Sequence, residues 1–295
     1  MISRHDIQIR DPFVYLEDGT YYLYGTTGRD CWKGPAEGFD AFVSRDLETF
    51  MPPVKVFSAN QQFWGRENFW APEMHRYKQS YYLFASFKSP GRRRATSILK
   101  ADSPLGPFLP WGDERVTPGD LECLDGTLHV DADGQPWLVF CHEWVQEGGG
   151  TICARRLKND LSGAMGEPVL LLKASDAAWT KRIRHSSGIE GHVTDGPFLY
   201  RGKKRLWMLW SSLSDSGYAA GLSWSESGGI GGPWIHKDKP LYQGDGGHGM
   251  FFKDINGSLK LALHAPNRTP DERPHFIPAE DRGDEIILQK EEAAE

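Results

Sequence analysis

Three aspartates stand where aromatic-rich β-strands are expected to begin. Asp11 opens the segment DPFVYLEDGTYYLYGTT, Asp125 opens DGTLHVDADGQPWLVF, and Asp195 opens DGPFLYRGKKRLWMLW. His248 begins a similar segment, HGMFFKDINGSLKLALHAP. Two carboxyl groups that face one bond can hydrolyse a glycosidic linkage, because one protonates the leaving oxygen while the other activates water. The residue types therefore indicate acid–base chemistry on a sugar.

Aromatic side chains accompany these carboxyl groups. The chain has 11 tryptophans, and aromatic rings stack on the C–H faces of sugars. The segment ENFWAPE at 67–73 places Trp70 and Glu73 at the start of another such strand, and Phe13 lies in the same segment as Asp11. We expect these three residues and His248 to bind the sugar. Of the other tryptophans, the rims are expected to hold Trp32, Trp64 and Trp144, and the strand cores Trp137, Trp207 and Trp210.

Five segments of the sequence share one pattern: a strand, a tight turn and a second, strongly apolar strand. They begin at residues 11, 71, 125, 195 and 248, and several contain hairpin turns such as EDG, DADG and INGS. Two further strands are expected after three of them, at 39–50, 97–108 and 221–234. Repeats of about four strands predict an all-β fold, a five-bladed β-propeller formed by residues 1–295 as a single domain. A β-sandwich of many hairpins is the alternative, although a sandwich does not need five similar units.

A propeller would bring the candidate residues together. The first strand of each blade lines the central channel, so residues at equivalent strand starts meet at one end of the axis. Asp11, Asp125, Asp195 and His248 are thus expected to converge. A single aspartate before a turn often only caps backbone N–H groups. A group of like charges held close is costly unless it has a task, which favours a functional site.

The composition argues against several function classes. The net charge of −6 disfavours a nucleic-acid-binding or membrane-binding surface, and the basic runs GRRR at 91–94 and TKRIRH at 180–185 are expected to be solvated loops. No stretch approaches 18 apolar residues, so no membrane-spanning helix is expected. Four cysteines without C-x-x-C spacing and no visible secretory signal favour a reduced, cytoplasmic protein. The oligomeric state is not indicated.

Five phrases in order make the chain resemble glycoside hydrolase family 43, a family of five-bladed propeller glycosidases. They are RDPFV at 10–14, WAPE at 70–73, LDGTLHVDADGQPWLVF at 124–140, DGPFLY at 195–200 and GHGMFF at 247–252. The resemblance implies that Asp11 is the general base, that Asp125 orients the acid and tunes its pKa, and that Asp195 is the general acid. The family usually has glutamate at this last position. Because aspartate is one methylene shorter, Glu190 in the preceding loop is the second candidate for the acid.

The same resemblance implies an inverting, exo-acting glycoside hydrolase that acts on plant polysaccharide fragments, with α-L-arabinofuranosidase activity ranked first. β-Xylosidase and exo-galactosidase activities of the family are alternatives. Two further alternatives are a mannoside phosphorylase, which would need a phosphate pocket beside a basic run, and a non-catalytic sugar-binding propeller. The expected partner is an oligosaccharide or polysaccharide.

No cofactor is expected to be required. The resemblance implies an axial histidine, here His248, often beside a calcium ion or waters in the channel. Calcium takes about six to eight oxygen ligands, so a structural calcium would be bound to His248 through waters. The letters GDGGHG at 244–249 match a dinucleotide-binding fingerprint, but a hairpin is expected after them instead of the required helix.

Overall fold

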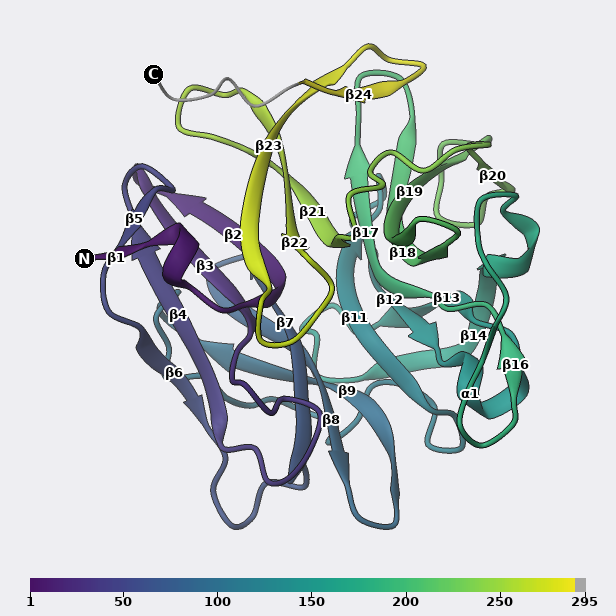
Figure 1. Cartoon of the computed structure of the whole chain (residues 1–295). Coiled ribbons are helices and arrows are strands. Elements are labelled where there is room, and N and C mark those ends of the chain that lie inside the picture. The colour runs from purple at the N-terminus through teal and green to yellow at the C-terminus, as the bar shows by residue number, and fades with distance from the viewer. Residues whose placement is uncertain (290–295) are drawn as a thin grey trace.

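The computed structural model describes residues 1–289, and its strands form five large antiparallel sheets around one axis, with one additional two-stranded sheet (Figure 1). This arrangement confirms the predicted all-β, five-bladed β-propeller. The first strands of neighbouring blades contact one another around the axis, and the later strands of each blade lie progressively farther out. The described part of the chain has no helix long and apolar enough to cross a membrane.

Each blade is built from one continuous stretch of chain. Blade one has six strands: β1 (Ile2–Ser3), β2 (Arg10–Glu17), β3 (Thr20–Thr26), β4 (Gly38–Ser44), β5 (Thr49–Phe50) and β6 (Val54–Ser58). Blade two has β7 (Glu67–Tyr77), β8 (Ser80–Ser89), β9 (Arg92–Ala101) and β10 (Leu109–Pro110). Blade three has β11 (Cys123–Val130), β12 (Pro136–His142), β13 (Thr151–Leu157) and β14 (Ala164–Lys173).

Blade four has β17 (Asp195–Arg201), β18 (Leu206–Ser214), β19 (Gly217–Ser225) and β20 (Trp234–His236). Blade five has β21 (Gly247–Lys253), β22 (Leu259–Ala265), β23 (Arg273–Asp281) and β24 (Ile286–Leu288). The short elements between these sheets are η1 (Arg4–Asp6), α1 (Trp144–Glu147), η2 (Ala174–Asp176), β15 (Ile183–Arg184) and β16 (Glu190–Gly191).

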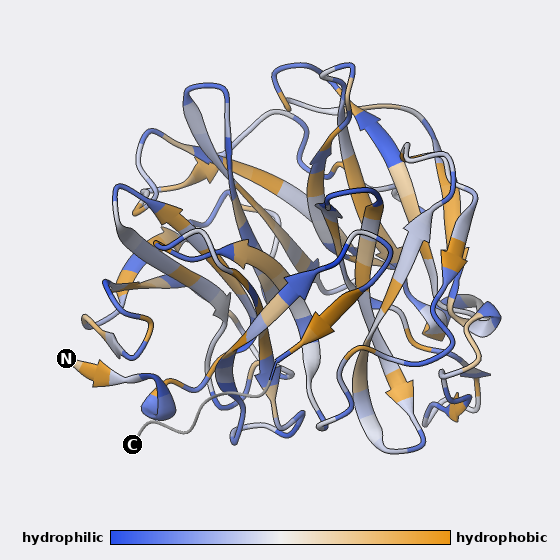
Figure 2. Cartoon of the chain, turned by 90° about the horizontal axis from the view of Figure 1, so that it is seen from above, coloured by the Kyte–Doolittle hydropathy of each residue, from blue (hydrophilic) through white to orange (hydrophobic). Residues whose placement is uncertain are grey.

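The core lies between the faces of adjacent blades. Hydrophobic segments concentrate on the strands, and the connecting loops are mostly hydrophilic (Figure 2). Trp207 and Trp210 on β18 are fully buried, as expected for core tryptophans, whereas Trp137 on β12 is only partly buried. Because side chains alternate between the two faces of a strand, each blade buries one apolar set against each neighbour.

A bulge at the same place in each first strand explains why carboxyl groups gather at the axis. The strand pairing shifts register there in all five blades. The bulged residues all have positive φ, between 46° and 56°: Asp11, Ala71, Asp125, Gly196 and His248. Bulges bend a strand and re-aim its side chains, and they are common beside active sites. The sequence phrases therefore mark bulges.

The bulged residue of blade four is Gly196, so Asp195 stands one residue earlier than sequence alignment with Asp11 and Asp125 suggests. Asp195 pairs with Ser211 just as Arg10 pairs with Thr26. Glycine is needed at 196, because a Cβ there would lie 2.6 Å from the ring of His248. The acid candidate thus approaches the pocket from a different position than the base candidate.

A ring of hydrogen bonds ties each bulge to the preceding blade. The N–H groups of Ala71, Asp125, His248 and Asp11 donate to the side chains of Thr26, Ser86, Ser211 and His264, respectively, at 2.8–3.1 Å. In blade three the residue equivalent to these acceptors is Cys141, which pairs with Leu124. Sulfur is a weak acceptor, and the N–H of Gly196 donates instead to Asp125 Oδ2 at 3.1 Å. This bond fixes the Asp125 carboxyl group.

Blades one and five meet without sharing a strand within the described residues. Their junction is held by side chains and loops. Arg10 forms an ion pair of 2.8 Å with the fully buried Glu272, and Arg273 Nε donates to the His5 carbonyl at 2.6 Å. The bond from the Asp11 N–H to His264 crosses the same junction.

Candidate active site

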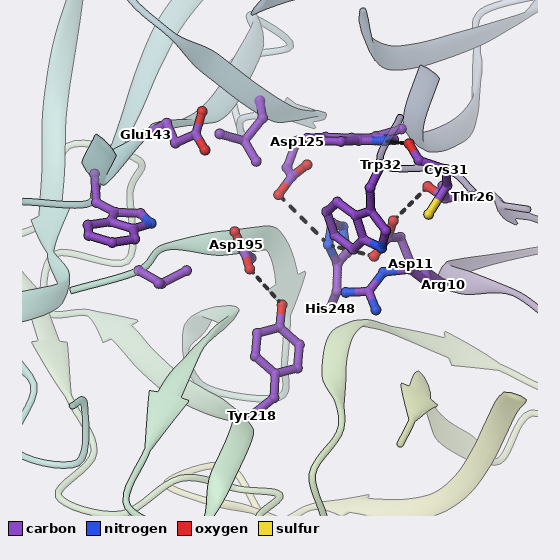
Figure 3. Close-up of a pocket in the computed structure, with 14 residues that line it drawn as sticks. Arg10, Asp11, Thr26, Cys31, Trp32, Asp125, Glu143, Asp195, Tyr218 and His248 are labelled. Carbon is purple, nitrogen blue, oxygen red and sulfur yellow. Dashed lines mark hydrogen bonds and ion pairs between the residues drawn. The ribbon is translucent and has the colours of Figure 1, made fainter. Parts of the chain in front are cut away.

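A cavity of about 190 Å³ opens at the end of the axis where the bulges meet (Figure 3). All five blades contribute to its lining, which includes Asp11, Asp125, Asp195, Trp70 and His248. These residues come from five different first strands, as the propeller geometry requires. The structure therefore brings together the three carboxyl groups, the histidine and one tryptophan that the sequence singled out.

Asp11 has a cationic or hydrogen-bonding neighbour on each oxygen. His248 Nδ1 lies 3.1 Å from Oδ1, and the Thr26 hydroxyl donates to Oδ2 at 2.6 Å. Burial opposes ionisation, yet His248 and Arg10 lower the pKa of Asp11 below its usual value. Asp11 is therefore an ionised carboxylate at neutral pH.

Asp125 and Asp195 lie in a different environment, without a cation in direct contact at hydrogen-bonding distance. The Gly196 N–H donates to Asp125 Oδ2, and the Tyr218 hydroxyl donates to Asp195 Oδ2 at 3.0 Å. Burial raises the pKa of Asp125 to about 7 and that of Asp195 to about 6, and it outweighs the charge of His248, which lowers both. This side of the pocket therefore favours protonated carboxyl groups.

His248 stands between the two sides. Its Nδ1 is 3.1 Å from Asp11 Oδ1 and 3.7 Å from Asp125 Oδ2. Burial disfavours the imidazolium, but the carboxyl groups of Asp11, Asp125 and Asp195 together raise the pKa of His248 above its ordinary value. Its Nε2 is buried and has no hydrogen-bond partner within residues 1–289.

An ionised and a protonated carboxyl group facing one cavity can act as a base and an acid at the same pH. Aromatic rings border them. Trp32 lies against Trp70 with ring centroids 5.1 Å apart, and the Arg10 guanidinium lies over the ring of Trp32 at 4.7 Å. Carboxyl groups beside exposed aromatic faces are suited to a carbohydrate.

The sequence model of "Glycosyl hydrolases family 43" matches residues 6–286. The chain belongs to this family. The resemblance inferred from the five phrases is thereby confirmed, and the protein is a family-43 glycoside hydrolase by its sequence, fold and carboxyl-lined pocket.

Solved structures of other proteins share this fold over nearly their whole length. One is described as an endo-arabinase from Bacteroides thetaiotaomicron, with a TM-score of 0.87, 42% identity, and coverage of 94% of this chain and 96% of that chain. Another is described as an endo-1,4-β-xylanase from the same organism, with a TM-score of 0.77, 25% identity, and coverage of 98% and 96%.

The curated relatives are more distant. An extracellular exo-α-(1→5)-L-arabinofuranosidase of Cellvibrio japonicus is 24% identical over 172 residues, which cover 53% of this chain and 45% of the relative. An α-L-arabinofuranosidase of Humicola insolens is 23% identical over 301 residues, covering 89% and 58%. The match thus spans about half the length of these relatives.

Two of the sequence-predicted sugar ligands of this family-43 site do not line the pocket. Phe13 and Glu73 lie two residues beyond the bulged residues, deeper in the channel and buried. Glu73 Oε2 contacts His75 Nε2 at 3.2 Å, and the ring of Phe13 packs edge-on against His75. They support the floor beneath the pocket.

Glu190, the second candidate for the acid, also lies outside the pocket lining. Its side chain is exposed on β16, and its oxygens lie 3.3 Å from Arg182 and 3.9 Å from Arg184. The run TKRIRH is thus partly neutralised by Glu190. In the run GRRR, each arginine likewise contacts a glutamate: Arg92 contacts Glu114, Arg93 contacts Glu122, and Arg94 contacts Glu143.

The structure adds pocket residues to which the sequence assigned no role. Glu143 follows β12 and lines the pocket beside Asp195, whose pKa its charge helps to raise after the larger effect of burial. Arg10, Glu143 and Tyr218 carried no signal of their own. Trp32 and Trp144 had been expected only near a rim, and both line the pocket.

Proposed function

We propose that the protein is an inverting, exo-acting α-L-arabinofuranosidase that acts on plant polysaccharide fragments. The observation that supports it most is that Asp11, whose pKa is lowered, and Asp195, whose pKa burial raises to about 6, line one tryptophan-bordered cavity. The choice of arabinose rests on the names of similar proteins, which include an endo-arabinase and arabinofuranosidases.

In the proposed reaction, Asp11 accepts a proton from a water molecule, whose oxygen attacks the anomeric carbon. Asp195 gives its proton to the glycosidic oxygen as the bond to the leaving group breaks. One water is consumed, and the sugar leaves with inverted configuration. Asp125, fixed by the Gly196 N–H, is proposed to orient the acid, and the charge of Asp195 helps to raise the pKa of Asp125 after the larger effect of burial.

The size and walls of the cavity support an exo mode. At about 190 Å³ the cavity is smaller than the roughly 300–1,000 Å³ of drug-sized ligand sites, so it suits a single terminal sugar. Trp32 stands beside it, and its Nε1 donates to Thr269 of the neighbouring blade at 2.9 Å. This contact walls off the side toward blade five.

An endo-acting arabinanase is the second candidate. A further cavity, of about 450 Å³, adjoins the first and shares Arg10, Trp32, Asp195 and Tyr218 with it. It could hold more of a chain if Trp32 moved aside. The 42% identity of this chain to a protein described as an endo-arabinase supports this second candidate.

The test is a panel of aryl glycosides (arabinofuranoside, xyloside and galactoside), assayed with and without phosphate, followed by linear arabinan. We expect phosphate-independent release of arabinose, and proton NMR should show an inverted anomer as the first product. Release of short oligosaccharides from arabinan without free arabinose would establish the endo mode. A retained anomer would overturn the mechanism, and binding without turnover would identify a sugar-binding propeller.

We also propose that activity requires no metal. Within residues 1–289, no group of three or more His, Cys, Asp or Glu side chains is arranged to hold one. The raised pKa of His248 favours the imidazolium, which has no lone pair for a cation. A calcium ion in the channel would have to be held mainly by water, so the residues present do not fit a direct calcium site.

A further inference from the structure

Tyr218 reaches the pocket from outside the first strands. It lies at the start of β19, beside the β18–β19 turn, and its side chain is 3% exposed. Its hydroxyl donates to Asp195 Oδ2 at 3.0 Å (Figure 3). The hydroxyl therefore holds one oxygen of the proposed acid and leaves Oδ1 available for the transferable proton.

The ring of Tyr218 packs against His264, the residue that accepts the backbone N–H of the proposed base Asp11. It stacks on the imidazole of His264, with ring centroids 5.7 Å apart and an interplanar angle of 25°. His264 Nδ1 accepts the Asp11 N–H, so its Nε2 carries the proton and donates to Asn267 Oδ1 at 3.2 Å. Burial lowers the pKa of His264 to about 4, which keeps the ring neutral.

Four residues thus form one continuous chain of contacts from base to acid: Asp11, His264, Tyr218 and Asp195. Asp11, His264 and Tyr218 are buried and Asp195 is partly buried. The link to Asp11 is made through its backbone N–H. The chain runs through blades five and four, around the sugar cavity instead of across it.

We propose that Tyr218 is a positioning residue for the general acid, and that its stack with His264 sets the spacing between the acid and the base. This inference rests on the proposed function. The spacing decides whether a water fits beside the sugar, because inverting enzymes hold their carboxyl groups about 6.5–9.5 Å apart. Because the aspartate side chain is short, it has few rotamers that reach the glycosidic oxygen. The hydrogen bond from Tyr218 to Oδ2 therefore fixes the position of the carboxyl group.

The charges around Asp195 and Tyr218 determine how the pH dependence of kcat would change when the Tyr218 hydroxyl is removed. Seven titratable groups within the described residues face Asp195 and Tyr218: His248, Asp11, Asp125, Glu143, Arg10, His264 and Cys141. The Tyr218 hydroxyl bonds to the ionised form of Asp195 and so opposes the rise in pKa that burial causes. Removing the hydroxyl therefore raises the pKa of Asp195 and moves the alkaline limb of kcat to higher pH.

The test compares Tyr218→Phe with Tyr24→Phe. Each loses one buried tyrosine hydroxyl, but Tyr24 on β3 of blade one donates to the Pro104 carbonyl between β9 and β10 of blade two, and neither residue lines the pocket. For Tyr218→Phe we expect roughly tenfold slower hydrolysis of oligosaccharides, whose leaving groups are poor, and less than about a twofold change with dinitrophenyl glycosides. Tyr24→Phe should change neither rate. Equal behaviour of the two variants would overturn the inference.

A measurement without substrate separates this inference from the proposed function. In protein labelled at the aspartate carboxyl carbons, the signal of Asp195 is assigned by its loss in Asp195→Asn and titrated by NMR. An upward shift of its pKa in Tyr218→Phe supports the positioning role, even if no arabinoside is cleaved. An unchanged pKa contradicts that role, even in an active arabinofuranosidase.

Discussion

The two sides of the pocket use the same residue type in opposite states. On the side of blades one and five, Asp11 is held between His248, Arg10 and Thr26, and its pKa is lowered. On the side of blades three and four, the Gly196 N–H and the Tyr218 hydroxyl are the donors to Asp125 and Asp195, and His248 lies farther away, 3.7 Å from Asp125. Burial raises the pKa values of both carboxyl groups and outweighs the opposing charge of His248. The difference shows that the division of labour between base and acid comes from neighbours supplied by other blades.

The largest effect should come from removing the charge on the first side. Asp11→Asn keeps the size of the side chain and its bond from Thr26 but cannot accept a proton from water. We expect a loss of about 10²–10⁴-fold in kcat for all substrates, whatever the leaving group, with an unchanged circular dichroism spectrum. Near-normal turnover in the folded variant would remove Asp11 as the base.

The second side should show a dependence on the leaving group. Asp195→Ala is expected to lose about 10²-fold or more on oligosaccharides and much less on dinitrophenyl glycosides, because a good leaving group departs without a proton. Glu190→Ala, which changes an exposed residue outside the pocket, is the matched control and should behave as wild type. If Glu143→Gln lost activity on oligosaccharides but not on dinitrophenyl glycosides, and Asp195→Ala did not show this difference, the general acid would be Glu143 of blade three.

A smaller effect, on stability, should sharpen the comparison further. Asp125→Asn keeps the acceptor for Gly196 but removes a carboxyl group whose folded pKa is raised. A raised pKa means that the folded state binds the proton more tightly than the unfolded state, so wild type loses stability as pH rises above about 4 toward the folded pKa. The melting temperature of Asp125→Asn should therefore exceed that of wild type by a few degrees at pH 8 and match it near pH 4. The opposite trend would mean that Asp125 is stabilised as a carboxylate.

The smallest effect is expected from chelation. Dialysis against EDTA should change kcat by less than about twofold, because the raised pKa of His248 favours its imidazolium, and because no group of three or more His, Cys, Asp or Glu side chains within residues 1–289 is arranged to hold a metal ion. The control is the same dialysis followed by addition of calcium. Loss of activity that calcium restores would show that water-held calcium stabilises the site.

Much of the site could be predicted because several of its residues occupy equivalent positions in the repeated segments of the sequence. Asp11, Asp125 and His248 stand at bulges, where a polar residue begins three of the five repeated segments. The offset of Asp195 could not be seen, because a bulge changes the register by one residue without changing the local pattern. Only the paired strand, with Ser211 opposite Asp195, reveals it.

The other differences between the expected and the observed pocket residues have equally physical causes. Phe13 and Glu73 come two residues after the bulged residues, and two residues of strand advance by roughly 6.6 Å, so both lie outside the pocket lining. Glu143 and Tyr218 belong to a loop and to a third strand, and their approach to the axis depends on how neighbouring blades pack. No local periodicity encodes such an approach.

The junction of the first and last blades gives the enzyme a weak point that coincides with its chemistry. Asp11 has its proposed task where, within residues 1–289, the first and last blades meet through Glu272, His264 and Arg273. Separating these two blades would leave every sheet paired but would pull the base away from His248. In mild denaturant, activity should then be lost at a lower denaturant concentration than β-structure. Turnover would measure whether blades one and five are still in contact.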